Sequence, residues 1–397
     1  MRVAIVGAGI GGLTAAIALT RRHVRVRVLE QAPELSAAGA SLAVDPNASR
    51  LFEEFGLFTQ LRAVAVEPEA AEYVRWHDGR VLLRTPLGAT AQEQFGAPAL
   101  DFLRSDLQRV LVEALPEGAL TLGAQVTSVR QDATGVDVLL ADGGRLRADV
   151  VIAADGLHSQ IRQRLVPDSA PVFSGTVVYR GLVRRDEARG IQPEAVHRYW
   201  VGPHRHSVVY WISAGNLMAV NTAVRDPDAA RDSGTDRAGP AEVIAFHEGW
   251  ESGLLERFRH CRTIHRGPVF VTSPLGQWAF GRVALLGDAA HAMQPFEAQG
   301  AAQAIEDAYV LAECLGSVSG DKVTAALRRY EDLRIERATE VQQASSRAAE
   351  VFYLPDGVAQ RERDADYLTV HQRQPGGRRR WIWEYDVRKV VAGHLGP

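Results

Sequence analysis

The most constraining feature of the chain is its N-terminal alternation of strand, glycine turn and helix. Residues 2–6 form a short, β-branched apolar segment, and Gly7-Ala8-Gly9-Ile10-Gly11-Gly12 follows directly. Helix-forming residues then extend over 13–22, and residues 24–29 alternate between apolar and basic as a second strand. Short apolar strands of this kind are buried in parallel sheets covered by helices. The segment therefore predicts the first unit of a Rossmann-like α/β fold.

The glycines follow the GxGxxG pattern at Gly7, Gly9 and Gly12, and Glu30 closes the second strand. In this pattern the first glycine allows a tight turn, the second lets the backbone approach a pyrophosphate, and the third lets helix and strand pack closely. The helix N-terminus then faces the anion. An acid at position 30 accepts hydrogen bonds from ribose hydroxyls, which favours FAD or NAD over NADP. A glycine turn without a ligand is the alternative, and the flanking strands and the acid weigh against it.

The rest of the chain contains no second copy of this fingerprint, but two apolar segments end in a glycine–acid pair, Asp155-Gly156 and Gly287-Asp288. Strand-like segments dominate residues 173–224, and the chain is mostly helical from residue 287 to about residue 352. We therefore expect a discontinuous organisation. A nucleotide-binding domain would contain residues 1–72, 98–172 and 270–350. A mainly antiparallel substrate-binding domain would contain residues 73–97 and 173–269, and residues 351–397 would form a helical C-terminal extension.

Composition excludes several classes of function. The 45 basic and 48 acidic side chains leave a net charge of -3, which gives no global attraction to nucleic acid or to anionic membranes. Cys261 and Cys314 form no CxxC pair and the histidines lack ligand spacing, so we predict neither a disulfide framework nor a metal site. Glycines break the apolar N-terminal stretch, which disfavours a signal peptide, and no segment approaches about 18 uninterrupted apolar residues. We expect a cytoplasmic monomer or homodimer without nucleic-acid or membrane partners.

The GxGxxG, Asp-Gly and Gly-Asp motifs, in this order, resemble those of the class A flavoprotein aromatic hydroxylases, from residue 2 to about residue 350. Residues 153–162 and 283–311 are most similar to the salicylate hydroxylase and 6-hydroxynicotinate 3-monooxygenase branch. The resemblance implies a Rossmann-like FAD-binding domain and a single-component monooxygenase. It would use NADH or NADPH and O2 to hydroxylate a small aromatic or heteroaromatic substrate through a flavin hydroperoxide. The alternatives are a flavin monooxygenase of a non-phenolic or polycyclic metabolite, and a protein that binds FAD without catalysis.

The resemblance also implies cofactor contacts for individual residues. The three fingerprint glycines would surround the FAD pyrophosphate, and Glu30 would bind the adenosine ribose. Asp155-Gly156 matches a motif implicated in both FAD and NAD(P)H binding. The remaining contacts would be Arg104 near the pyrophosphate and ribityl chain, Gly287-Asp288 at the ribityl or ribose hydroxyls, and the amides of Gly300 and Ala301 at the pyrimidine edge of the flavin, where reduced flavin carries negative charge.

On the substrate side, the chain departs from this resemblance at two positions. Relatives commonly carry one histidine in the strand matching residues 39–47 and another after the proline that follows the Gly-Asp motif, where this chain has Ala43 and Phe296. The sequence therefore does not identify the catalytic base. The remaining catalytic candidates are Tyr210, His206 and Arg180, although a purely structural role in the sheet is equally compatible with each.

Two further expectations concern the pocket and the C-terminal region. Phe296, Phe173 and Trp211 suggest an apolar pocket, with Gln294 and Gln299 as additional polar contacts. Arg378-Arg379-Arg380 is expected to form a solvated turn, and the aromatic residues beside it are expected to pack on the core or on a partner subunit.

Overall fold

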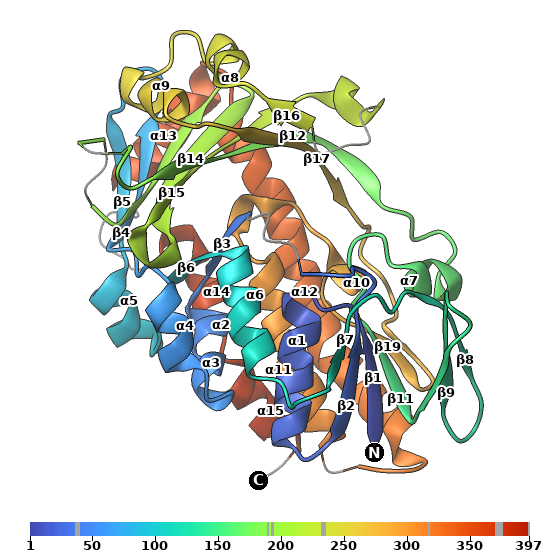
Figure 1. Ribbon diagram of the computed structural model, residues 1–397. Helices are drawn as coiled ribbons and strands as arrows, with labels where there is room; N and C mark the ends of the chain where they lie inside the picture. Colours follow the sequence, from blue (N-terminus) through green and yellow to red (C-terminus); the bar gives the residue numbers. More distant parts are fainter. Residues whose placement is uncertain are drawn as a thin grey trace.

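The computed structural model describes residues 1–35, 40–188, 190–191, 194–231, 236–316, 318–369 and 376–395. Figure 1 shows two main parts, an α/β body that contains the N-terminal strand and a large sheet that lies over one end of this body. Within the described ranges, no helix combines the length and apolar character needed to cross a bilayer.

The body is built on a six-stranded sheet in the order β18-β19-β11-β1-β2-β7. The first strand lies inside this sheet with parallel neighbours on both sides, and four of its five residues are buried. Central parallel strands are covered on both faces, which explains their continuous apolar sequences. The strands are β1 (Arg2–Val6), β2 (Arg25–Leu29), β7 (Leu120–Thr121), β11 (Val150–Ala153), β18 (Ala279–Phe280) and β19 (Val283–Leu285).

Helix α1 (Ile10–Arg21) lies against α11 (Gly300–Leu315), although one lies in the first third of the chain and the other in the last third. Gly11 lies at this contact: a Cβ there would be 3.0 Å from the Cβ of Ala304 and 2.7 Å from Cδ2 of Leu286. Gly11 has no role in the GxGxxG pattern, so its role is in packing. The long helix α12 (Lys322–Phe352) in turn packs on α11.

The large sheet has eight strands in the order β16-β17-β12-β15-β14-β13-β4-β5, and every neighbouring pair except β13 with β4 is antiparallel. Helices α8 (Pro240–Phe246) and α9 (Ser252–Arg259) cover its outer face (Figure 1). The strands are β4 (Ala70–Arg75), β5 (Val81–Pro86), β12 (Val172–Arg184), β13 (Val196–Gly202), β14 (Arg205–Ile212), β15 (Leu217–Arg225), β16 (Asp236–Ala238) and β17 (Ile264–Val271). The division of the chain into separate domains stays a prediction.

Smaller elements lie around these two parts. Strands β3 (Ser41–Val44) and β6 (Leu100–Leu103) form an antiparallel pair between the body and the large sheet (Figure 1). A three-stranded sheet contains β8 (Val126–Gln131), β9 (Val136–Leu140) and β10 (Arg145–Ala148). The shorter helices before residue 300 are α2 (Pro46–Ser49), α3 (Leu51–Glu54), α4 (Phe58–Val64), α5 (Gly88–Phe95), α6 (Arg104–Glu113), α7 (Gln160–Leu165) and α10 (Asp288–His291).

The C-terminal region contains α13 (Val358–Thr369), α14 (Arg380–Glu384) and α15 (Val387–Leu395). The predicted packing of its aromatic residues on the core holds for Trp383, which is buried with its ring centroid 5.6 Å from that of Phe95, whereas Trp381 is 37% exposed. The prediction of a solvated turn is wrong for Arg379, which is only 8% exposed. Its Nε donates to Oε2 of Glu297 at 3.1 Å, and its guanidinium lies over the ring of Tyr199, so buried partners compensate the charge.

Candidate active site

In the glycine turn after β1, Gly7 and Gly12 are required by the fold, whereas Gly9 has open space where a side chain would be. A Cβ on Gly12 would lie 2.1 Å from the carbonyl oxygen of Gly7, and one on Gly7 would lie 2.3 Å from the carbonyl oxygen of Ala154. A Cβ on Gly9 would meet only Nη2 of Arg104, at 4.0 Å. Gly9 also precedes the first turn of α1, which has neither a side-chain cap nor an acidic residue. This open, positively polarised turn fits a pyrophosphate.

Glu30 is held beside this turn by two backbone amides. Its Oε2 accepts a hydrogen bond from the Ala8 amide at 2.8 Å, and its Oε1 accepts one from the Ala32 amide at 2.9 Å. Each carboxylate oxygen has two lone pairs, so both can accept a further hydrogen bond from a ribose hydroxyl. Arg104 starts α6 and brings its guanidinium to the open side of Gly9.

The ends of β11 and β19 supply the other predicted cofactor residues. Asp155 is largely buried, its Oδ1 has no hydrogen-bond partner, and burial raises the pKa of its carboxyl. Gly287 has a φ of 63° and a ψ of -138°, a conformation open essentially only to glycine. A Cβ on Gly300, the first residue of α11, would be 3.9 Å from Oδ1 of the exposed Asp288. The Gly-Asp motif and the α11 N-terminus are therefore adjacent.

These features meet at the carboxyl edge of the parallel sheet, where open α/β sheets bind their cofactors. An unpartnered buried carboxylate oxygen on Asp155 and the open approach to Gly9 both fit a bound FAD. The amide of Gly287 donates to Oδ2 of Asp307 at 3.0 Å, and the same oxygen contacts Nε2 of His291 at 2.7 Å. The buried side chains of Asp307 and His291 thus stabilise the Gly-Asp turn.

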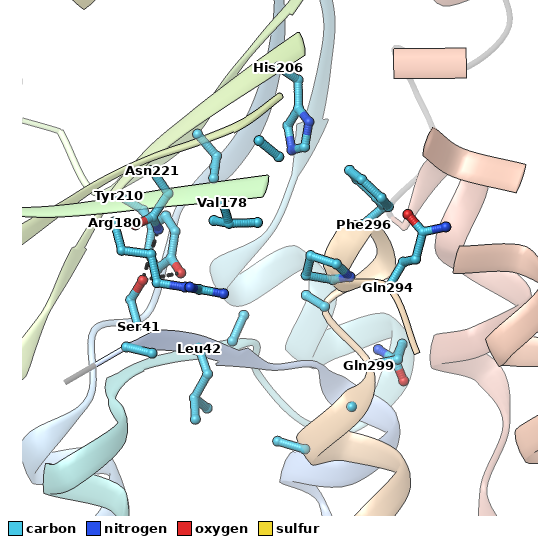
Figure 2. A pocket seen from close by; sticks show the side chains of 18 of the residues that line it. Ser41, Leu42, Val178, Arg180, His206, Tyr210, Asn221, Gln294, Phe296 and Gln299 are labelled. Atoms are coloured by element: carbon cyan, nitrogen blue, oxygen red, sulfur yellow. Dashed lines mark hydrogen bonds between the residues drawn. The ribbon is translucent and has the colours of Figure 1, made fainter. Parts of the chain in front are cut away.

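A cavity of about 300 Å³ lies between this edge and the inner face of the large sheet. Figure 2 shows the side chains that enter it from both sides. The sheet contributes all three catalytic candidates, Tyr210, His206 and Arg180, and the body contributes the predicted flavin contacts Asp288, Gly300 and Ala301. Ala43, Phe296, Gln294 and Gln299 also line it. The structure thus brings the three catalytic candidates and the predicted residues of the flavin end to one cavity.

Strand register explains why these sheet residues share one face. Arg180 lies opposite Asn221, Asn221 opposite Val208, and Val208 opposite Tyr199, so one row crosses β12, β15, β14 and β13. Directly opposed residues project to the same face, as do residues two positions apart within a strand. The other cavity residues on this face follow that rule: Val178, Ala223, His206, Tyr210 and His197.

Arg180 and Tyr210 form the polar centre of this face. The Tyr210 hydroxyl donates to Oγ of Ser41 at 2.8 Å, and Nδ2 of Asn221 donates to the same oxygen at 3.0 Å (Figure 2). Burial raises the pKa of Tyr210. Burial lowers the pKa of Arg180, and the neighbouring Tyr210 opposes this shift. Among the described residues, the Arg180 guanidinium has no ion pair and no hydrogen bond, and Figure 2 shows it reaching toward the middle of the cavity.

His206 lies in apolar surroundings. Its ring centroid is 5.2 Å from those of Phe296 and Phe352, and its Nδ1 has no partner. Burial lowers its pKa to about 3, so the ring is neutral at ordinary pH. These surroundings favour a packing role for His206 over a role as catalytic base.

The expected apolar wall is only partly correct. Phe296 lines the cavity, whereas Phe173 packs on Phe270 and Trp211 lies under the guanidinium of Arg185, both away from it. Gln299 is fully buried and its Nε2 donates to Oδ2 of Asp45 at 2.9 Å, so its amide is held by the protein itself.

The sequence did not identify three residues of the site: His197, its partner Asp101, and Arg379. His197 and Arg379 line the cavity, and Nε2 of His197 lies 2.5 Å from Oδ2 of the buried Asp101. The alternation of His197 and Tyr199 in β13 was the available signal for the first. Nothing in the sequence linked positions 101 and 379 to it.

Comparison with known proteins agrees with this geometry. Residues 1–345 match the FAD binding domain family. A 3-amino-4-hydroxybenzoate 2-monooxygenase of Streptomyces platensis is 39% identical over 98% of this chain and 97% of its own length. A 6-hydroxynicotinate 3-monooxygenase of Bordetella bronchiseptica is 33% identical over 87% of this chain and 90% of its own length.

Solved structures show the same arrangement. A salicylate hydroxylase in complex with its substrate is 27% identical and superposes with a TM-score of 0.84, over 100% of this chain and 98% of the other. HpxO from Klebsiella pneumoniae, in complex with FAD and uric acid, is 26% identical with a TM-score of 0.85 over the same shares. The expected fold, cofactor and enzyme class are confirmed: the chain belongs to the FAD-dependent aromatic monooxygenases.

Proposed function

We propose that the protein is an NAD(P)H-dependent monooxygenase that hydroxylates a single-ring aromatic acid with a ring hydroxyl, of the 3-amino-4-hydroxybenzoate type. The observation that carries this proposal is the guanidinium of Arg180, which lines the cavity and has no ion-pair or hydrogen-bond partner among the residues that the structure describes. A buried cation is costly unless it is paired, and arginine binds carboxylates through two parallel hydrogen bonds. A substrate carboxylate would therefore supply the missing partner.

The relatives support the same substrate class. Proteins named 3-amino-4-hydroxybenzoate 2-monooxygenase match nearly the full chain at 38% and 39% identity. The cavity, about 300 Å³, is at the small end of ligand pockets, which favours one ring over the polycyclic alternative.

The protein groups have separate tasks in this proposal. Gly9, Glu30 and Arg104 would hold the adenosine and pyrophosphate end of FAD, and Asp288 with the α11 N-terminus would hold its flavin end. When bound, FAD supplies the oxygen-transfer chemistry, by the flavin-hydroperoxide route that the family resemblance implies. Overall, one oxygen atom of O2 enters the ring and the other leaves as water, while NAD(P)H and one proton are consumed. Arg180 and Tyr210 would orient the ring against the flavin.

The test is product analysis under 18O2 with FAD-loaded protein. The panel would include 3-amino-4-hydroxybenzoate, 4-hydroxybenzoate, salicylate and 6-hydroxynicotinate, each with NADH and with NADPH. We expect at least one hydroxylated acid to stimulate nicotinamide oxidation and to gain one labelled oxygen atom. Failure of every acid in the panel, or stimulation only by rings without a carboxylate, would contradict the proposed substrate class.

A further inference from the structure

The site contains a histidine–carboxylate pair at the wall of the cavity. Asp101 is fully buried and lies directly opposite the cavity residue Ala43 in the β3–β6 ladder. Its side chain contacts His197 on β13 of the large sheet, and His197 lines the cavity. The buried carboxylate thus has a histidine partner that faces the cavity from another strand.

The hydrogen bonding of His197 leaves one ring nitrogen available to a ligand. Nε2 contacts Oδ2 of Asp101 at 2.5 Å, so it carries the proton in the neutral ring when Asp101 is ionised. Nδ1 makes no hydrogen bond to any residue that the structure describes, and the ring lines the cavity. A neutral histidine with a carboxylate behind it and a free nitrogen in front has the arrangement of a general base.

The charged and titratable groups around this pair come from several elements. Tyr210 of β14 has its ring centroid 4.9 Å from that of His197, and Tyr199 of β13 is at 6.1 Å. Asp45 and Arg379 interact electrostatically with the pair. Burial raises the pKa of Asp101, and His197 opposes this shift. A proton that moves to His197 would place a positive charge against the ionised Asp101, so the buried carboxylate would compensate that charge.

His197 and Arg180 project from the same face of the large sheet, but from strands that are far apart. His197 is on β13 and Arg180 is on β12, three strands away, so their backbones are separated by ~14 Å. Figure 2 shows Arg180 extending from its strand into the cavity beside Tyr210. An aromatic ring between them could place its carboxylate at Arg180 and its hydroxyl toward His197.

We propose that His197 is the catalytic base that deprotonates the ring hydroxyl of the substrate, and that Asp101 is its positioning residue. The inference rests on the function proposed above. The O–H bond of the substrate breaks, its proton moves to Nδ1 of His197, and the electron pair stays on the ring oxygen. The resulting phenolate is richer in electrons at the ring carbons ortho and para to its oxygen, which favours transfer of an electrophilic oxygen to those carbons. The hydroxylated carbon later loses its own proton as the ring regains aromaticity, and His197 returns its proton to solvent or to the product oxygen.

The test separates ionisation of the bound substrate from turnover. Binding of 3-amino-4-hydroxybenzoate to FAD-loaded protein is followed anaerobically, without nicotinamide, by ultraviolet difference spectra, because phenol and phenolate absorb differently. We expect the wild-type protein to bind the phenolate at neutral pH. His197→Asn should bind the phenol form, and Asp101→Asn should raise the apparent pKa of the bound hydroxyl. Turnover by His197→Asn of an acid that takes up oxygen ortho or para to its hydroxyl should fall about 100-fold or more and recover as pH rises.

His394→Asn, at an exposed position on α15 away from the cavity, is the matched control and should keep both the spectrum and the rate. FAD content and thermal melting show whether each variant is folded. A phenolate spectrum and an unchanged pH profile in folded His197→Asn would overturn the dyad while leaving the proposed function intact. If folded His197→Asn fails to bind the acid, the same measurement on Asp101→Asn provides the test. An apparent pKa of the bound hydroxyl equal to that in the wild-type protein would then also overturn the dyad. Absence of hydroxylation by the wild-type protein with every hydroxylated acid would instead refute the proposed function.

Discussion

Replacing Arg180 by methionine should weaken substrate binding and stabilise the free protein at the same time. This guanidinium is half-buried and has no partner among the described residues, and burial lowers its pKa. Methionine keeps much of the side-chain length and removes the uncompensated charge. Because the group faces a cavity that water can enter, we estimate a gain of about 1 kcal/mol in the free energy of unfolding, or about 1–2 °C in melting temperature.

The loss of affinity follows from the bond that the variant cannot make. A hydrogen-bonded arginine–carboxylate contact contributes about 1.5–3 kcal/mol, which corresponds to about 10- to 150-fold in Kd. The assay compares the Kd of 3-amino-4-hydroxybenzoate with that of 2-aminophenol, which lacks the carboxylate, by perturbation of the flavin spectrum. The wild-type protein should prefer the acid, and Arg180→Met should bind both with similar affinity.

The matched control is Arg184→Met, at an exposed position of the same strand, where the arginine pairs with Asp186. It should change neither affinity nor melting temperature measurably, because exposed ion pairs contribute little. Equal losses of affinity for the acid and for 2-aminophenol in Arg180→Met would refute the assignment of Arg180 to the carboxylate.

Three further predictions concern the cofactor site and the dependence of stability on pH. Gly9→Ala should leave the melting temperature of the apoprotein unchanged but lower its FAD content, whereas Gly12→Ala should destabilise the apoprotein itself, since only the second Cβ would meet backbone. Asp288→Ala should lower FAD occupancy, and full occupancy on purification would refute its assigned role. His206→Leu should lose part of the acid sensitivity of unfolding. The folded protein keeps His206 neutral to about pH 3, while the unfolded chain binds a proton at this residue below about pH 6.5. His206 therefore lowers the free energy of unfolding as pH falls between those values, by about 1.4 kcal/mol at pH 5.5. Chemical unfolding at pH 7.5 and 5.5 measures the difference, and equal pH dependence in wild type and variant would contradict it.

The sequence by itself determined the class of fold and the cofactor. The glycine turn, its flanking strands and Glu30 are local, and each acts on residues a few positions away or on the ligand. The two later glycine–acid motifs follow apolar strands, and parallel strands that share one sheet bring their carboxyl ends to the same edge. Local patterns were therefore enough to predict which residues gather at this edge, where we propose that FAD binds.

Only the tertiary structure decided what lines the substrate side of the cavity. Asp101 and His197 are separated by 96 positions and lie in different sheets, so no local pattern relates them. Arg379 stands in a basic triplet that is typical of a solvated turn, and it is buried because Glu297 and Tyr199 compensate its charge. The partnerless state of Arg180 is likewise a property of its surroundings. Charge compensation depends on which side chains from distant parts of the sequence come into contact. The packing of the large sheet over the FAD-binding body determines these contacts.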